Sequence, residues 1–108
     1  MALDPVEYYK LFIKVFGSPV RLKILNSLKS SPKSVQEICK ELNLEQSLVS
    51  HNLKCLLDCG FVNNKREGKR VIYSINESIV FPLFELIDKH IEKYKDKLIS
   101  CGIIKSES

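Results

Sequence analysis

The stretch SVQEICKELNLEQSLVSHNLKCLLDCG, residues 34–60, contains two helical patterns separated by a short connection. The pattern Ser34-x-x-Glu37 is a capping box, and the apolar spacing after it predicts a short helix that ends at Leu42. A second helix is predicted from Gln46 to Cys59, and Gly60 suits the left-handed residue that follows many helices. A short helix, a tight turn and a second helix together predict a helix-turn-helix unit.

The second of these helices has an apolar side and a polar side. Its apolar positions are Leu48, Val49, Leu53, Leu56 and Leu57. The other side carries amide, hydroxyl, imidazole and ammonium groups: Gln46, Ser47, Ser50, His51 and Lys54. Because an α-helix fits the major groove of B-DNA, we expect these polar side chains to contact base edges and phosphates.

The hydrophobic period changes after Gly60. Strand-forming residues at 61–62 and 71–75, with the turn signal Glu67-Gly68 between them, predict a two-stranded hairpin. The tip of this hairpin carries four cations: Lys65, Arg66, Lys69 and Arg70. Residues 46–75 have a net charge of +3, whereas residues 76–108 have a net charge of −1. A helix-turn-helix followed by a basic hairpin predicts a winged helix-turn-helix that binds duplex DNA.

Further helices are predicted on both sides of this unit. Asp4-Pro5 begins a helix that runs to Phe16, and Ser18-Pro19 begins the next. The last helix follows the hairpin, is capped by Asn76 or Ser78, and has Pro82 in its first turn. Apolar residues form a seam along this helix that suits a partner helix: Phe84, Ile87, Ile91, Tyr94 and Leu98.

These elements define one fold class and one domain. We predict a mainly α fold with a small β-hairpin, in the order α-α-α-α-β-β-α, that dimerises through its first and last helices. The domain is expected to span residues 1–102, with a loose tail over residues 103–108.

Composition narrows the class of protein. The 108 residues are 44% hydrophobic and 28% charged, with a net charge of +4, as in a globular domain that favours a polyanionic partner. The sequence shows no apolar run long enough to span a membrane and no secretory signal, so we expect a cytoplasmic protein. It also shows no glycine-rich phosphate loop and no complete nucleophilic triad, and we predict that the chain is not an enzyme.

Four cysteines in a reducing compartment suggest metal or thiol chemistry rather than disulfides. Cys55 and Cys59 are four residues apart on a helix, which places their Cβ atoms roughly 5–6 Å apart on one face. Two thiolates can share a soft cation, and Cys101 of the same or the other chain is a candidate third ligand. Cys39 is expected to pack in the core.

The sequence resembles the ArsR/SmtB family of metal- and redox-responsive repressors. The resemblance rests on the segments at 19–25, 44–53, 59–62 and 68–73, and it covers about residues 5–98. Within the family, Cys55, Cys59 and Cys101 match the ligand positions of the cadmium- and lead-sensing (CmtR-type) branch. Two positions depart from the family pattern, since Glu45 replaces the usual Ser cap and Asn52 replaces a common second His.

The resemblance implies a homodimeric repressor that binds palindromic operator DNA and leaves it when a soft metal ion binds the cysteine thiolates. Cadmium and lead are the expected effectors, with arsenite and zinc as alternatives, and no organic cofactor is implied. Two other hypotheses remain at this point. The same DNA-binding fold could sense thiol oxidation or persulfide, or the winged helix could bind a protein instead of DNA.

Overall fold

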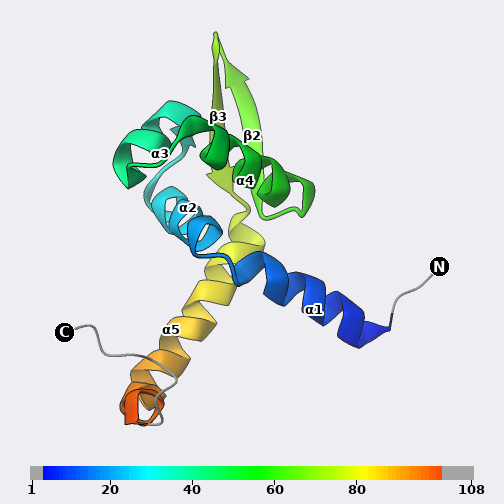
Figure 1. The fold of residues 1–108 in the computed structure, drawn as a ribbon, viewed down its shortest axis with the longest axis vertical. Helices are drawn as coiled ribbons and strands as arrows, with labels where there is room; N and C mark the ends of the chain where they lie inside the picture. The colour runs from blue at the N-terminus through cyan, green and yellow to red at the C-terminus, as the bar shows by residue number, and fades with distance from the viewer. Residues whose placement is uncertain (1–3, 101–108) are drawn as a thin grey trace. The chain divides into compact units, whose positions relative to one another are not determined.

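The computed structural model describes residues 4–100, which form five helices and three strands (Figure 1). The helices are α1 (Pro5–Phe16), α2 (Pro19–Ser30), α3 (Val35–Leu42), α4 (Gln46–Asp58) and α5 (Glu77–Ser100). The strands are β1 (Lys33–Ser34), β2 (Val62–Glu67) and β3 (Arg70–Ile75). The chain divides into two compact units, one ending at Asn76 and the other beginning with α5.

The predicted mainly helical fold is confirmed, and so are most of the helix ends. The Asp4 carboxylate accepts a hydrogen bond from the Val6 backbone N–H at 3.0 Å and caps α1. The Ser34 capping box is present at the start of α3, and Gly60 has a φ of 82° directly after α4. These ends follow from local chemistry, since each cap satisfies backbone groups that the helix itself leaves unpaired.

Strand β1 was not predicted from the sequence. It pairs antiparallel with β3, with Lys33 opposite Tyr73 and Ser34 opposite Ile72. The resulting sheet has the order β1-β3-β2. The sequence analysis predicted only a turn and a helix cap here, because a two-residue strand is too short to show alternation.

The first turn of α5 also differs from the prediction. The helix begins at Glu77, so Pro82 lies in its second turn and inside the helix. Asn76 precedes the helix and bonds elsewhere: its backbone N–H donates to the Phe61 carbonyl at 3.0 Å, and its Nδ2 donates to the Gly60 carbonyl at 2.9 Å. Within residues 4–100, no helix has both the length and the apolar character needed to cross a membrane.

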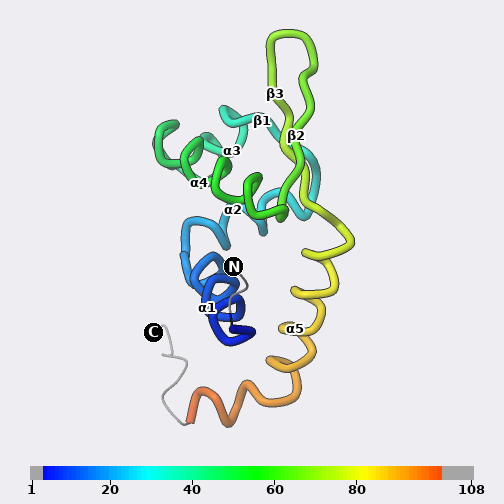
Figure 2. The backbone as a smooth tube through the Cα atoms, turned by 90° about the vertical axis from the view of Figure 1, so that its right-hand side faces the viewer, coloured from blue at the N-terminus to red at the C-terminus, as the bar shows by residue number. Residues whose placement is uncertain are grey.

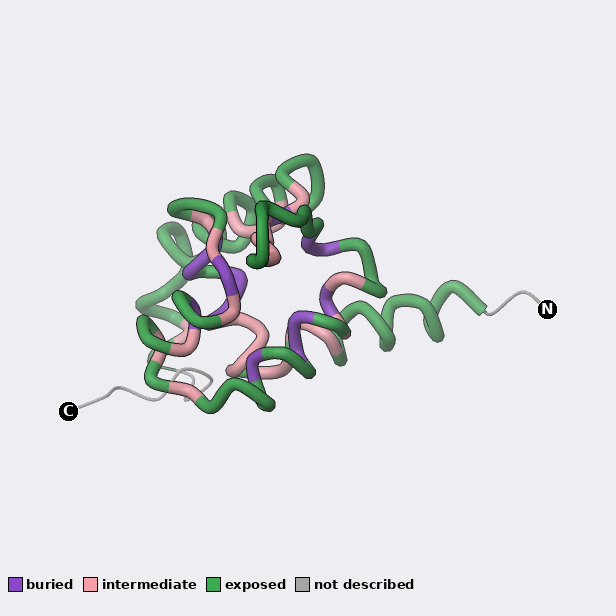
Figure 3. Tube along the Cα trace, turned by 90° about the horizontal axis from the view of Figure 1, so that it is seen from above, coloured by how far each residue is buried: buried purple, intermediate pink, exposed green. Residues whose placement is uncertain are grey.

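The core of the first unit lies between α2, α3, α4 and the sheet. Its fully buried side chains come from each of these elements: Ile24, Leu25, Ile38, Val49, Leu53, Leu56 and Val62. On α4, Val49, Leu53 and Leu56 are buried as the helical spacing predicts, whereas Leu48 is 39% exposed and Leu57 is only half-buried. Figure 3 shows that the helix leading from the N-terminus, α1, is exposed along nearly its whole length.

The hairpin of β2 and β3 extends beyond the helices of its unit (Figures 1 and 2). Its register pairs Val62 with Ile75 at the base and Glu67 with Arg70 at the tip. Gly68 has a φ of 64°, a left-handed conformation that other residues adopt at a cost, and this supports the tight turn. The hairpin is therefore the wing expected in a winged helix-turn-helix.

Candidate functional site

The polar face of α4 is exposed to solvent as predicted. Gln46, Ser47, Ser50, His51 and Lys54 are all exposed. The buried side of the same helix packs against α2 and α3, which fixes the direction in which the polar side points. Lys54 also pairs with Asp58 one turn later at 3.2 Å, an exposed pair that phosphate could displace.

Asn52 lies on the inner side of α4 and serves a structural purpose. Its Oδ1 accepts a hydrogen bond from Arg21 Nε at 3.1 Å, and its Nδ2 donates to the Leu48 carbonyl at 2.8 Å. Arg21 also donates from Nη1 to the Lys14 carbonyl in the last turn of α1, at 3.5 Å. This link between α1, α2 and α4 was missed in the sequence, where only the apolar residues around Asn52 indicated an inward position.

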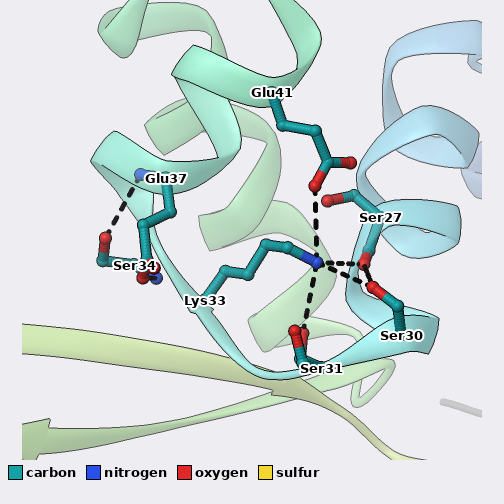
Figure 4. Close-up of polar contacts among 7 residues, drawn as sticks. All are labelled: Ser27, Ser30, Ser31, Lys33, Ser34, Glu37 and Glu41. Atoms are coloured by element: carbon teal, nitrogen blue, oxygen red, sulfur yellow. Dashed lines mark hydrogen bonds and ion pairs between the residues drawn. The ribbon is translucent and has the colours of Figure 1, made fainter.

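Lys33 fixes the connection between the helices that precede α4 (Figure 4). Its side chain is 12% exposed, and its ammonium donates to the Ser27 and Ser31 carbonyls and to Ser30 Oγ. It also forms an ion pair with Glu41 on α3 at 3.5 Å. Because one largely covered cation joins the end of α2 to α3, the first helix of the helix-turn-helix is held by these polar contacts as well as by the core.

The four cations of the hairpin are in two different situations. All four are exposed, and Lys65 pairs with the neighbouring Glu67 at 3.4 Å. Arg70 differs in its partners, because its Nη2 donates to Glu37 Oε1 at 2.6 Å and to Ser34 Oγ at 3.1 Å. The sequence grouped all four as phosphate contacts, and only three of them are free of partners in α3.

Glu37 is held in its ionised form by the same network. The Ser34 backbone N–H donates to Glu37 Oε1 at 2.9 Å, and the Glu37 N–H donates to Ser34 Oγ at 3.2 Å. Hydrogen bonds from the Ser34 backbone and side chain, followed by the charge of Arg70, lower the pKa of Glu37 below its ordinary 4.5. Ser34, Glu37 and Arg70 therefore form one hydrogen-bonded cluster at the N-terminus of α3.

This cluster gives an expected pH dependence of stability. Because the pKa of Glu37 is lower in the folded state, its stabilising contribution is complete above the unfolded pKa and is lost as the pH falls through the folded pKa. The variant Glu37→Gln keeps a capping-box residue but lacks this titration. We expect urea midpoints of the two proteins to differ at pH 7 and to converge in acid, and a difference that persists well below pH 4.5 would contradict the assignment.

Cys55 lies in the last turn of α4, and Cys59 follows the helix as its C-terminal cap, because α4 ends at Asp58 rather than at the predicted Cys59. Cys55 is half-buried and Cys59 is exposed. Both line a groove of about 350 Å³ with Arg21, His51, Lys54 and Asp58. Partial burial and the hydrogen-bonded Cys55 thiol raise the pKa of Cys59, while the Arg21 guanidinium acts in the opposite direction.

The cysteine pair supplies two ligands but does not complete a metal site by itself. Among residues 4–100, no three His, Cys, Asp or Glu side chains are arranged to hold a metal ion. Cys101, the predicted third ligand, lies outside the described residues. Cys39, which we expected in the core, is half-buried on α3.

The helix-turn-helix, the exposed polar face of its second helix and the projecting hairpin define a winged-helix transcriptional regulator. Residues 18–64 match the family of bacterial regulatory proteins named arsR. The chain is 33% identical over 75 residues to the probable mercury resistance operon repressor of Streptomyces lividans. It is 32% identical over 80 residues to the HTH-type transcriptional regulator NmtR of Mycobacterium tuberculosis. The chain therefore belongs to the arsR family.

The aligned regions cover 69% and 74% of this chain, but 60% of the Streptomyces repressor and 67% of NmtR. Both relatives are named as regulators of transcription, which confirms the prediction that the chain is not an enzyme.

Solved structures support the same fold. Rv0081 of Mycobacterium tuberculosis has a TM-score of 0.79 and 28% identity, over 90% of this chain and 99% of that one. The homodimeric winged helix-turn-helix DNA-binding domain of Mb0332 from Mycobacterium bovis has a TM-score of 0.68 and 27% identity. That match covers 87% of this chain and 93% of the Mycobacterium bovis fragment. The winged helix-turn-helix prediction is thereby confirmed.

Proposed function

We propose that the protein is a homodimeric repressor that binds operator DNA through α4 and the hairpin and leaves it when a soft metal ion binds cysteine thiolates. The observation that carries the proposal is the position of Cys55 and Cys59. Cys55 on α4 and Cys59 at its C-terminal cap line a groove shared with His51 and Lys54, two of the side chains expected to contact DNA. A ligand of this groove therefore acts on the DNA-binding helix itself.

The DNA-binding part of the proposal rests on shape and charge. The exposed polar residues of α4 can reach base edges in the major groove, and the hairpin cations can reach the neighbouring phosphates. In a dimer, two copies of α4 would meet half-sites roughly 34–36 Å apart on a palindrome.

The hairpin cations have a distinct expected effect. Replacing Lys65, Arg66 and Lys69 with Ala should weaken binding to every duplex and flatten the salt dependence, by up to about 0.9 in slope per lost phosphate contact. Replacing Gln46 or Ser47 should change sequence preference instead. The matched control replaces Lys89, Lys95 and Lys97 of α5 with Ala, which removes the same charge from exposed positions off the seam. Filter binding at several salt concentrations measures the slopes, and equal slopes for both triple variants would refute the placement of the wing.

The dimer part rests on apolar surface that the described units leave uncovered. Along α1 the exposed apolar side chains are Val6, Tyr8, Tyr9, Leu11, Phe12 and Ile13. Along α5, the seam residues Ile87, Ile91 and Tyr94 are exposed as well. The Mycobacterium bovis domain, which shares this fold, is homodimeric. A second copy of this chain is therefore the proposed occupant of both helices.

The metal part rests on the chemistry of the two thiols. Thiolates select soft cations, and one relative is named as a mercury resistance repressor. Cys55 and Cys59 would each supply a thiolate, and we propose Cys101 as the third ligand. Cadmium and lead are the proposed effectors on the resemblance to the CmtR-type branch, and arsenite, zinc and mercury share the preference for sulfur.

A single titration tests the proposed switch. Reduced protein is bound to a duplex selected by the protein from a random library, and Cd(II), Pb(II), Hg(II), Zn(II) or As(III) is added. Thiolate-to-metal absorption and fluorescence anisotropy of the duplex are followed together. We expect absorption and DNA release to rise in parallel for at least one thiophilic ion. Release by hydrogen peroxide with no release by any of the five ions would instead establish a redox sensor.

A further inference from the structure

Arg70 joins the hairpin to the first helix of the helix-turn-helix. Its Nη2 lies 2.6 Å from Glu37 Oε1 and 3.1 Å from Ser34 Oγ, across 33 and 36 residues of sequence. Glu37 Oε1 is fixed in turn by the Ser34 backbone N–H at 2.9 Å. The guanidinium therefore contacts an acceptor whose position the capping box already determines.

The Arg70–Glu37 contact lies near the tip of the hairpin, beyond the residues of β3 that pair with β1. Strand β1 pairs with β3 only at Tyr73 and Ile72, while Arg70 is opposite Glu67 at the turn. A two-stranded hairpin is only marginally stable without further packing, so one contact near the tip can decide its direction. Arg66 and Lys69 lie in the part of the hairpin beyond the β1 pairing, while Lys65 is opposite Ile72 at its border.

The same contact borders a cleft between the wing and the DNA-binding helix. The cleft has a volume of about 530 Å³ and is lined by Glu37 and Arg70 together with Gln46 at the start of α4 and Lys69 at the tip. Gln46 and Lys69 are both proposed DNA contacts. The Glu37–Arg70 pair thus sets the separation between two parts of the interface that must fit one duplex together.

We propose that Arg70 is a positioning residue, which with Glu37 fixes the wing relative to α3 and α4, rather than a phosphate contact like its three basic neighbours. The inference rests on the proposed DNA-binding function. Arg70 is suited to this use, because its planar guanidinium keeps a fixed geometry that a lysine ammonium lacks. In this role Glu37, an acidic residue beside the basic hairpin, anchors the wing.

The two possible roles of Arg70, phosphate contact and positioning residue, predict opposite effects of Glu37→Gln on the affinity for DNA. If Arg70 contacts phosphate directly, Glu37 competes with DNA for it, and Glu37→Gln should strengthen binding. If Arg70 positions the wing, Glu37→Gln should weaken binding by about 1.4- to 5-fold, the range expected for loss of an exposed ion pair. Arg70→Lys should weaken binding to a similar degree, although it keeps the charge.

The experiment measures the affinity of wild type, Glu37→Gln, Arg70→Lys and the double variant for the library-selected duplex and for a mixed-sequence duplex. Glu92→Gln is the matched control, since it removes the same charge from an exposed position on α5, in the other unit of the chain. The double variant should be no weaker than either single variant, because both remove one contact. Hydrogen exchange of the DNA-free proteins is the second measurement. We expect faster exchange over residues 64–70 in both single variants and not in the control.

The affinity and exchange measurements each test the positioning role of Arg70. Tighter DNA binding by Glu37→Gln, or additive losses in the double variant, would overturn the positioning role. Unchanged exchange over residues 64–70 would also overturn it, and this arm requires no DNA. If wild type binds neither duplex while exchange responds as expected, the contact positions the wing but the proposed DNA-binding function fails.

Discussion

The substitution Ile91→Asp is expected to convert the dimer to monomers and to abolish binding to operator DNA. Ile91 lies at the middle of the seam on α5 and is 38% exposed. Its seam neighbours have similar exposed fractions, 40% for Ile87 and 38% for Tyr94. Association would remove this apolar area from water, which is worth roughly 25 cal/mol per Å². An aspartate there would have to be buried without a partner, and a carboxylate in that position is strongly destabilising.

Loss of DNA binding follows from the symmetry of the complex. One protomer reaches one half-site, so a monomer loses the contribution of the second half-site and the geometry that positions both. Sedimentation at micromolar concentration measures the assembly, and anisotropy of the selected duplex measures binding. Leu86→Asp is the matched control, because Leu86 is 67% exposed on the same helix and lies off the seam. A wild-type monomer, or a dimer of Ile91→Asp, would refute this interface.

The parts of the fold that were predictable from the sequence are those that depend on neighbouring residues. The Asp4 cap, the capping box at Ser34 and the left-handed Gly60 each satisfy groups within a few residues. Helical spacing likewise gave the buried faces of α2, α3 and α4, because the 3.6-residue period is a property of the helix alone.

The features that were missed depend on partners distant in the sequence. Strand β1 exists because Ser34 lies beside Ile72, and no pattern within two residues can show that. The Arg70–Glu37 and Arg21–Asn52 contacts join residues 33 and 31 positions apart. A cation on a basic hairpin has the same sequence signature whether it contacts phosphate or a carboxylate of its own protein. The sequence therefore predicted which residues of the hairpin are cations. Only the structure distinguished Arg70, which bonds to Glu37, from the other three.

Replacing Cys55 or Cys59 with Ser should abolish tight metal binding and leave a repressor that remains on its operator. Cys55 lies on α4 and Cys59 is its C-terminal cap. Their groove includes Arg21, which also bonds to Asn52 on α4 and to the last turn of α1. Metal binding at the cysteines can therefore act through Arg21 on both α1, a proposed dimer helix, and α4, the proposed DNA-binding helix. Couplings between two such sites are typically about 1–3 kcal/mol, so metal should weaken DNA binding by about 5- to 150-fold in wild type.

The third ligand and the control complete the set of variants. Cys101→Ser should retain some metal binding through the helix pair and lose most of its effect on DNA, because Cys101 is the proposed link to the C-terminal segment. Cys39→Ser should behave as wild type, since Cys39 is on α3 and outside the groove. Reciprocity also requires operator DNA to weaken metal binding by the same factor, which competition with a chelator measures. If Cys55→Ser, Cys59→Ser and Cys101→Ser all release DNA at the wild-type cadmium concentration, the sensing site must lie elsewhere in the chain.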